Sequence, residues 1–190
     1  MKTTVKKIAA IAAAMVLILS LAACGNTSDK PESGSTPDVF PSFTATDMSG
    51  NKVTEQTFKE HSVTVLNIWF TGCAGCVEEM PNLEKISEKL KEKDGQMVGL
   101  CLDAADEETK KQALKILNNK GVSYTNLAVD SSSDAQKYLD SITAFPTTLL
   151  VDRNGNIIGD AVVGSIDTQK QIDAFMKRVN DIVAKDGGQK

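Results

Sequence analysis

The sequence predicts an α/β domain with a mixed β-sheet, because strand-like and helix-like segments alternate along the chain. Residues 63–70 are nearly all apolar and rich in β-branched and aromatic side chains, which is typical of a strand buried on both faces. The turn sequence Asp-Arg-Asn-Gly at residues 152–155 follows an apolar, β-prone segment and predicts a hairpin. With 190 residues, the chain is long enough for one such domain with a full hydrophobic core.

The first half of the predicted domain contains two buried strands and two helices. After the strand at 63–70, apolar residues recur at three- and four-residue steps between residues 77 and 90, which predicts a helix. A second buried strand is expected at residues 96–102. Asp106 can cap a second helix that runs to about Asn119.

The second half alternates in the same way. Residues 124–129 are expected to form a short strand and residues 133–139 a short helix. The segments 147–151 and 156–163 flank the predicted turn, so they are expected to pair as an antiparallel hairpin. A closing helix over about residues 168–184 places its apolar side chains on one side.

Residues 1–23 have the layout of a secretory signal, with three lysines before a long apolar run. The segment Leu-Ala-Ala before Cys24 resembles the lipobox of bacterial lipoproteins, whose cysteine carries a diacylglyceryl group and becomes the mature N-terminus. An ordinary secretion signal is the alternative. Residues 24–37 contain several Ser and Pro and almost no apolar residues, which predicts a flexible tether to a membrane. The folded domain is then expected at residues 38–185, with a tail at 186–190.

Charge limits the partners of this domain. The formal net charge of the chain is −4, and the predicted domain has no basic cluster. A mildly acidic domain of this kind is not expected to bind nucleic acid. We expect a monomer that acts on other proteins.

Cys73 and Cys76 form a Cys-Ala-Gly-Cys motif, whose two-residue gap is the usual gap of a redox pair. A zinc site would need two further ligands, and His61 is the only histidine. A c-type haem site would need a histidine at position 77, where the chain has valine. A copper(I) site on the two cysteines stays open. The redox interpretation requires neither a metal nor a cofactor.

The predicted secondary structure gives the two cysteines different roles. Cys73 lies where the strand at 63–70 gives way to a helix, and the free N–H groups and dipole of a helix N-terminus favour a thiolate. Cys73 is therefore expected to attack a substrate disulfide. Cys76, one helical turn later and more buried, can attack the mixed disulfide and release the partner.

Glu79 and Pro146 are further candidates for the site. Glu79 follows Cys76 by three residues and could exchange a proton with it if the carboxylate is partly buried. A solvated helix glutamate, as expected for Glu78, is the alternative. Pro146 stands at the entry to a predicted strand, where a cis bond would expose neighbouring backbone groups to a substrate strand. From the residues alone, a trans bond is the commoner outcome.

Three motifs together resemble the thioredoxin-like proteins, most closely their TlpA/ResA-type thiol–disulfide oxidoreductases. Residues 69–76, followed by Glu-Glu-Met-Pro at 78–81, resemble the active-site segment of that family. Residues 144–148 and the turn at 152–155 are similar to its cis-proline strand and hairpin, and residues 41–52 to its N-terminal hairpin. The resemblance implies a thioredoxin-like fold, in which helices flank a central mixed sheet that carries an N-terminal β-hairpin extension.

The resemblance also implies a role for each candidate residue. Cys73 would be the nucleophile and Cys76 the resolving thiol, while Pro146 would be cis and face the pair. Glu79 matches the acidic residue that this branch carries after its motif. Asn67 stands where thioredoxins keep a buried aspartate, so that proton route is absent.

Some residues depart from the family pattern. Gly72 replaces the tryptophan that commonly precedes the first cysteine, and Ala74-Gly75 lacks the proline or charged residue often found between the cysteines. Both departures leave the redox potential open, because stabilisation of the thiolate sets it. Cys101 lies outside the motif and is expected to be a buried core thiol.

The function implied by the resemblance is reductive. An extracytoplasmic, lipid-anchored enzyme would keep apocytochrome c or other exported proteins reduced, with electrons from a membrane donor of the CcdA/DsbD type. An oxidative, disulfide-forming protein or a peroxide-linked redox protein is the alternative within redox chemistry. A non-enzymatic lipoprotein that binds partners or copper(I) is the alternative of another class, and the intact cysteine pair counts against it.

Overall fold

The computed structural model describes residues 38–187, so the predicted signal segment, Cys24 and the tether lie outside the described residues. Its strands are β1 (Thr44–Asp47), β2 (Lys52–Thr54), β3 (Val63–Trp69), β4 (Gly95–Cys101), β5 (Thr125–Val129), β6 (Thr147–Asp152) and β7 (Val162–Val163). Its helices are the 3₁₀ helix η1 (Glu55–Glu60) and the α-helices α1 (Ala74–Lys91), α2 (Glu107–Lys120), α3 (Ala135–Asp140) and α4 (Gln169–Gly187). None of these helices combines the length and the apolar character that crossing a bilayer requires.

The strands form one mixed sheet in the order β2-β1-β5-β4-β3-β6-β7. β3, β4 and β5 are parallel, whereas β1, β2, β6 and β7 run antiparallel to the strands that they pair with. The predicted mixed sheet is thus confirmed, and β1 with β2 forms the expected N-terminal hairpin. β3 lies inside the sheet between β4 and β6, and every one of its residues is buried, as its apolar sequence predicts.

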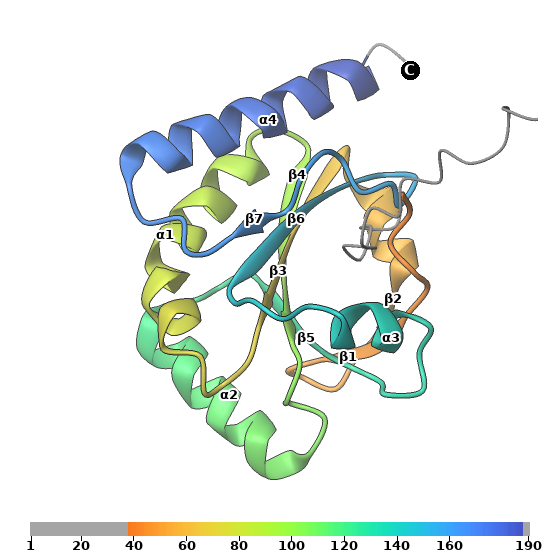
Figure 1. The fold of residues 1–190 in the computed structure, drawn as a ribbon, viewed down its shortest axis with the longest axis vertical. Helices are drawn as coiled ribbons and strands as arrows, with labels where there is room; N and C mark the ends of the chain where they lie inside the picture. The colour runs from red at the N-terminus through yellow and green to blue at the C-terminus, as the bar shows by residue number, and fades with distance from the viewer. Residues whose placement is uncertain (1–37, 188–190) are drawn as a thin grey trace, which may run out of the picture. The chain divides into compact units, whose positions relative to one another are not determined.

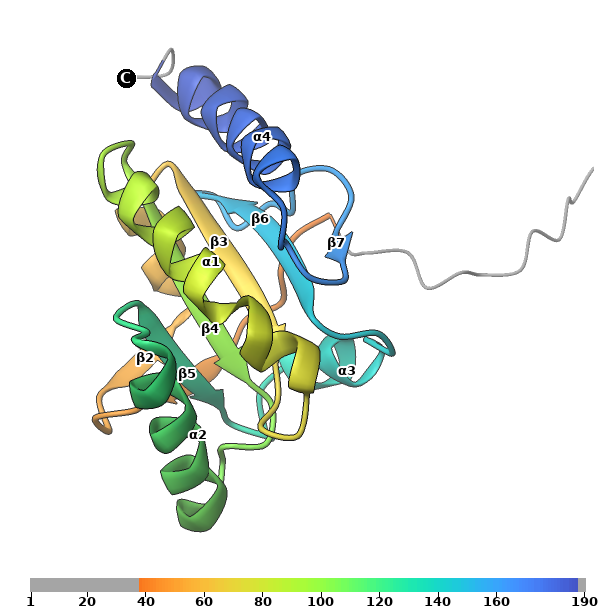
Figure 2. The same cartoon turned by 90° about the vertical axis from the view of Figure 1, so that its left-hand side faces the viewer.

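Helices cover both faces of the sheet (Figures 1 and 2). α1, α2 and α4 lie on one face, and α3 and η1 lie on the other. Side chains of β3 alternate between these layers. Val63 and Val65 pack with the inner residues of α1 and α4, whereas Leu66 and Ile68 pack with Phe58 of η1. β3 is therefore packed on both faces, and its carboxyl end leads into the cysteine motif.

The carboxyl ends of β3 and β4 lie side by side, because Trp69 is the register partner of Cys101. The Trp69 indole donates its Nε1–H to Oδ1 of Asn126 in β5, at 3.0 Å. Gly99 leaves the space that this amide needs, because a Cβ at Gly99 would lie only 2.0 Å from the same oxygen. These contacts connect the three neighbouring strands β3, β4 and β5 near the strand ends that lead to the cysteines.

The predicted C-terminal hairpin is only partly correct. A continuous strand over residues 156–163 was expected, but only isolated bridges follow the turn, and the regular strand is confined to β7. Two carbonyls of this segment, those of Ile158 and Asp160, accept hydrogen bonds from Arg178 of α4 at 3.2 and 2.7 Å. Gly159 between them adopts a left-handed backbone with φ of 69°. The strand is interrupted because the carbonyls of Ile158 and Asp160 bind the Arg178 side chain of α4 and not a neighbouring strand.

The last helix extends further than expected. α4 continues to Gly187, so Asp186, which the sequence places in a tail, lies in its final turn. Asp186 accepts hydrogen bonds from Nε and Nη2 of Arg153 at 2.6 and 2.7 Å. This bidentate contact holds the end of the helix on the domain. The other predicted helices and strands are present within a few residues of their expected ends.

Candidate active site

Cys73 occupies the turn that joins β3 to α1. The turn is closed by a hydrogen bond from the Cys73 amide to the Phe70 carbonyl at 3.1 Å. Cys73 is the N-cap of α1, and its Sγ accepts the amide hydrogen of Cys76 at 3.2 Å. A sulfur thus takes the place that Ser, Thr or Asp holds at most helix starts. The backbone N–H groups and the dipole of α1 consequently favour negative charge on this sulfur.

The two cysteines form a disulfide with an S–S distance of 2.05 Å and a Cα–Cα distance of 5.3 Å. Cys73 is 8% exposed, whereas Cys76 is completely buried beneath it. The sequence-based expectation that Cys76 is the more buried sulfur is confirmed. An incoming reactant can therefore approach Cys73 but not Cys76.

Glu79 is a buried carboxylate, not a solvated one. It is completely buried, while the neighbouring Glu78 is exposed. Its oxygens accept hydrogen bonds from Asn67 Nδ2 at 2.9 Å and from the Ile166 amide at 3.0 Å. Burial raises the pKa of Glu79 to about 7, and the nearby charge of Asp167 acts in the same direction, against the two hydrogen bonds. A carboxyl group with this pKa can take up or give a proton near neutral pH.

Asn67 connects Glu79 to the neighbouring strand. Its amide also donates to Thr148 Oγ1 of β6 at 3.0 Å, and Asn67 and Thr148 are partners in the β3–β6 register. Both side chains are buried. An aspartate at position 67 would bring a second carboxylate against Glu79, whereas the asparagine supplies neutral donors.

Pro146 lies beside the cysteine motif at the start of β6, where it is buried. The Phe145–Pro146 peptide bond is cis, as the family resemblance implied. Pro146 Cδ lies 3.9 Å from the point where a Cβ at Gly75 would be, and the Pro146 carbonyl accepts the Gly164 amide at 2.9 Å. The Ser165 hydroxyl donates a hydrogen bond to the Gly75 carbonyl at 3.4 Å. The segments around residues 75, 146 and 165 therefore meet next to the disulfide.

Asp103 is a residue that the sequence analysis missed. Its carboxylate accepts the Thr71 amide at 3.0 and 3.1 Å and the Thr71 hydroxyl at 2.6 Å. It also accepts the Cys101 thiol at 3.2 Å. Asp103 follows the carboxyl end of β4, and because β3 and β4 are parallel neighbours, this end lies beside the end of β3. That position in the sequence could have indicated that Asp103 lies close to the cysteine motif. Asp103 thus anchors the turn that carries Cys73.

Cys101 is a buried thiol, as expected. It is 1% exposed and packs in the same apolar cluster as Cys73 and Cys76. Burial and the adjacent Asp103 carboxylate raise the pKa of Cys101 well above its ordinary value. Among residues 38–187, no group of three or more His, Cys, Asp or Glu side chains is arranged to hold a metal ion.

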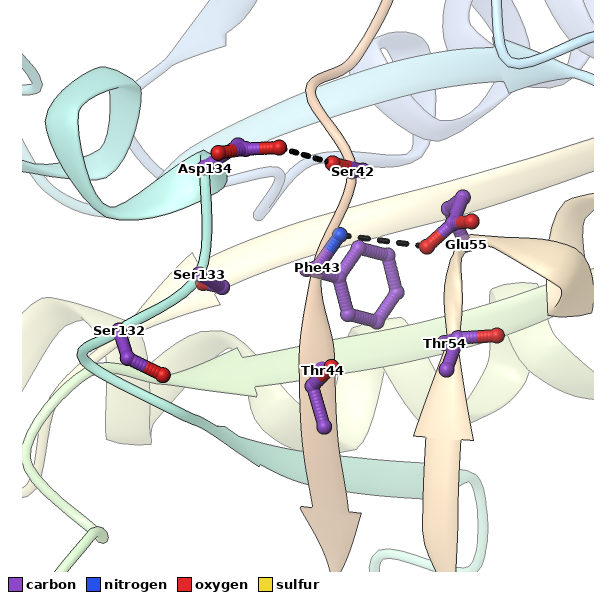
Figure 3. A pocket seen from close by; sticks show the side chains of 8 residues that line it. All are labelled: Ser42, Phe43, Thr44, Thr54, Glu55, Ser132, Ser133 and Asp134. Atoms are coloured by element: carbon purple, nitrogen blue, oxygen red, sulfur yellow. Dashed lines mark hydrogen bonds between the residues drawn. The ribbon is translucent and has the colours of Figure 1, made fainter.

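A separate pocket of about 340 Å³ lies between β1, β2 and the segment before α3 (Figure 3). The Ser42 hydroxyl donates to Asp134 and the Phe43 amide donates to Glu55 at its rim, so the chain before β1 is tied to both neighbouring segments. The Ser133 hydroxyl in its lining has no hydrogen-bond partner within the described part of the chain. None of the cysteine-site residues lines this pocket.

Known proteins share this sequence pattern. The Redoxin family model matches residues 33–176. The thiol-disulfide oxidoreductase ResA of Bacillus anthracis is 28% identical over 141 residues, which are 73% of this chain and 75% of that protein. The thioredoxin-like protein YneN of Bacillus subtilis is 29% identical over 133 residues, which are 70% of this chain and 74% of YneN.

A solved structure shares the fold. The thioredoxin domain of a thiol-disulfide oxidoreductase from Bacteroides vulgatus has a TM-score of 0.61 and 28% identity to this chain, and the match covers 77% of this chain and 99% of that domain. The predicted thioredoxin-like fold is therefore confirmed. The chain belongs to the Redoxin family, and it is a thiol–disulfide oxidoreductase of the ResA type with Cys73 and Cys76 as its cysteine pair.

Proposed function

We propose that the protein is an extracytoplasmic reductase that keeps exported proteins in the dithiol state through Cys73 and Cys76. The observation that carries this proposal is the contrast between the two sulfurs. Cys73 caps α1 and keeps 8% of its surface exposed, whereas Cys76 is completely buried. A protein substrate thus meets the one sulfur of the pair that the helix N-terminus polarises.

Reduction takes two thiol–disulfide exchanges. The Cys73 thiolate attacks one sulfur of the substrate disulfide, so a Cys73–substrate bond forms and the other substrate sulfur leaves as a thiolate that takes up a proton. Deprotonated Cys76 then attacks Cys73 Sγ and releases the second substrate thiolate, which is also protonated. The substrate gains two electrons and two protons, and the enzyme ends with the Cys73–Cys76 disulfide seen in the structure.

Glu79 and Pro146 are proposed to support these steps. Glu79 lies one turn after Cys76 on α1, and its raised pKa suits it to receive the proton of Cys76 before the second exchange. Pro146 is proposed to border the substrate-binding surface, because its ring lies beside Gly75 between the cysteines. Neither role requires a metal or a cofactor.

The cellular setting is proposed from the sequence outside the described residues. Residues 1–23 are proposed as a signal peptide, Cys24 as the site of a lipid anchor and residues 24–37 as the tether, with the domain at 38–185. The proposed substrates are apocytochrome c or other exported proteins, and a membrane donor of the CcdA/DsbD type would restore the dithiol. In cells supplied with a labelled fatty acid, the wild-type protein should take up the label and Cys24→Ala should not.

A trapping experiment in intact cells tests the reductase proposal. With Cys76→Ser, the mixed disulfide on Cys73 cannot be resolved, so exported disulfide-bearing proteins should accumulate on Cys73 and be released by a chemical reductant. The double variant Cys73→Ser/Cys76→Ser should trap nothing. In wild-type cells, alkylation of free thiols should find Cys73 and Cys76 mainly reduced.

Two results would contradict the proposal. If Cys76→Ser traps no protein, Cys73 is not the nucleophile. If the wild-type pair is mainly oxidised and the trapped chains are newly exported proteins that later gain disulfides, electrons flow in the oxidative direction.

A further inference from the structure

Three segments of the chain converge around Cys73 and form what is called here the neutral rim: residues 70–75, 144–147 and 162–165. Direct contacts join all three. The Phe70 and Phe145 rings pack edge to face with centroids 5.2 Å apart, the Gly164 amide binds the Pro146 carbonyl, and Ser165 reaches Gly75. A substrate whose disulfide touches Cys73 must lie against this rim.

The neutral rim carries no charged side chain. Charged residues make up 24% of the whole chain, yet residues 69–77, 141–151 and 161–166 contain none. Of the carboxylates near the rim, Asp103 accepts from Thr71 and Glu79 accepts from Asn67, whereas Asp167, two residues after Ser165, is exposed. The rim itself therefore offers apolar contact and backbone groups, with no side-chain charge of its own to attract or repel a substrate.

Phe70 and Phe145 are the large apolar groups of this rim. Both rings are half-buried and pack against the apolar cluster that contains Cys73. The Phe70 ring lies over the backbone of Gly72, because a Cβ at Gly72 would meet Phe70 Cε2 at 3.3 Å. A side chain at position 72 would displace this ring. Cys73 is flanked in the chain by Gly72 and Ala74, which are both small and exposed. No large side chain next to Cys73 in the chain therefore blocks a substrate from its sulfur, and the two rings lie beside this approach.

We infer that the Phe70–Phe145 pair selects the substrates of this enzyme: it binds an uncharged apolar side chain next to the cysteine of an extended substrate segment. This inference rests on the reductase function proposed above and names the class of polypeptide that it acts on. A substrate side chain laid on two aromatic rings removes apolar surface from water on both partners. An acidic or basic side chain at the same place would be desolvated without a partner of opposite charge.

Two matched peptide disulfides test the inference. They share one sequence and one disulfide, and the residue next to the attacked cysteine is Leu in one and Glu in the other. Reduced wild-type protein should reduce the Leu peptide with a kcat/KM at least about tenfold higher, which is the preference that contact with one apolar side chain supplies. The preference for the Leu peptide should persist at high salt, because the contact with the rim is apolar and is not screened by ions.

Variants of the two phenylalanines test whether their rings cause the preference for the Leu peptide. Phe145→Ala and Phe70→Ala should lose most of the Leu-over-Glu preference, while Phe145→Leu should retain much of it because the apolar surface remains. Val39→Ala is the control, since Val39 is an exposed apolar residue outside the rim, at 51% exposure, and it should behave as wild type. All variants are also assayed on a small aliphatic disulfide that cannot reach both rings, so that a change in substrate selection is distinguished from a change in the redox site itself.

The outcomes distinguish a failure of this inference from a failure of the proposed reductase function. A wild-type enzyme that reduces neither the small disulfide nor the peptides overturns the reductase function. A wild-type enzyme that reduces both peptides equally, or alanine variants that keep the full preference, overturns the inference alone. Equal loss of activity on all disulfides in the alanine variants would mean that the rings shape the redox site and do not select substrates.

Discussion

The pKa of the Glu79 carboxyl rises on folding, which is not expected of a glutamate on the protein surface. It is completely buried, and burial raises its pKa from 4.5 to about 7. Helix periodicity left its burial undecided, because the groups that enclose it come from distant segments: Asn67 from β3 and Ile166 from the loop before α4. Its nearest sequence neighbour, Glu78, has the same residue type and the opposite environment.

The raised pKa predicts a specific pH dependence of stability. Between pH 4.5 and about 7 the unfolded chain loses the Glu79 proton while the folded domain keeps it. Glu79 therefore reduces the free energy of unfolding as pH rises through this window, by on the order of 2 kcal/mol. Urea unfolding of the oxidised protein near pH 5 and pH 8 measures this loss. It should disappear in Glu79→Gln and persist in Glu78→Gln, and an identical loss in both variants would contradict the assignment.

Among the elements, the turn between β3 and α1 depends on a partner from another strand. Asp103, beyond the end of β4, binds both the amide and the hydroxyl of Thr71, and Thr71 lies two residues before Cys73. The sequence predicted the strand, the helix and the position of Cys73 between them from local apolar patterns. It could not predict this anchor, because no local pattern shows which side chain a loop will meet.

Removing the anchor should loosen the turn without unfolding the domain. In Asp103→Ala, the Thr71 amide loses its acceptor, so its hydrogen exchange should accelerate by roughly tenfold or more. Asp106→Ala is the matched control: it removes an exposed N-cap of α2, three residues away, that accepts the amides of Glu108 and Thr109. The control should leave Thr71 protected. Unchanged exchange at Thr71 in Asp103→Ala would show that the anchor does not hold the turn.

On the scale of the whole molecule, one arginine joins segments from both ends of the domain. Arg153, in the turn after β6, binds Asp186 at the end of α4 through two nitrogens, and it also reaches Ser62 at 3.1 Å and Asp94 at 3.3 Å. Ser62 is buried just before β3, and its hydroxyl oxygen lies 2.7 Å from a carboxylate oxygen of each aspartate, so the two share its single hydrogen. The cluster ties α4 to the sheet.

Loss of this cluster should lower the thermal stability of the domain. Asp186→Asn removes the charge that pairs with Arg153, and we expect Tm to fall by about 3–6 °C. Asp181→Asn is the control on the same helix, because Asp181 forms a surface ion pair with the exposed Lys177; its Tm should change by no more than about 1–2 °C. Calorimetry of the oxidised proteins measures both values. Equal shifts in the two variants would mean that the Arg153 cluster is no stronger than a surface ion pair.

The fold was predictable from sequence wherever burial follows a regular period. β3 and α1 appear where apolar residues run continuously or recur at helical steps, since those patterns match the two-faced and one-faced burial of a strand and a helix. The second strand of the C-terminal hairpin was overpredicted, because Arg178 takes two of its carbonyls. The end of α4 was underpredicted, because Asp186 is held by a residue 33 positions earlier in the chain. Both errors come from contacts between distant segments.

Alkylation of the reduced protein at varied pH, with each cysteine followed by mass spectrometry, tests the central role of Cys73 most directly. Because Cys73 lies at the N-terminus of α1 and is the less buried member of the pair, it should react first, with a pKa below the ordinary value of about 8.5, while Cys76 and Cys101 stay unmodified. A Cys73 that titrates at or above that value, or a Cys76 that reacts as fast, would contradict the assignment of Cys73 as the nucleophile.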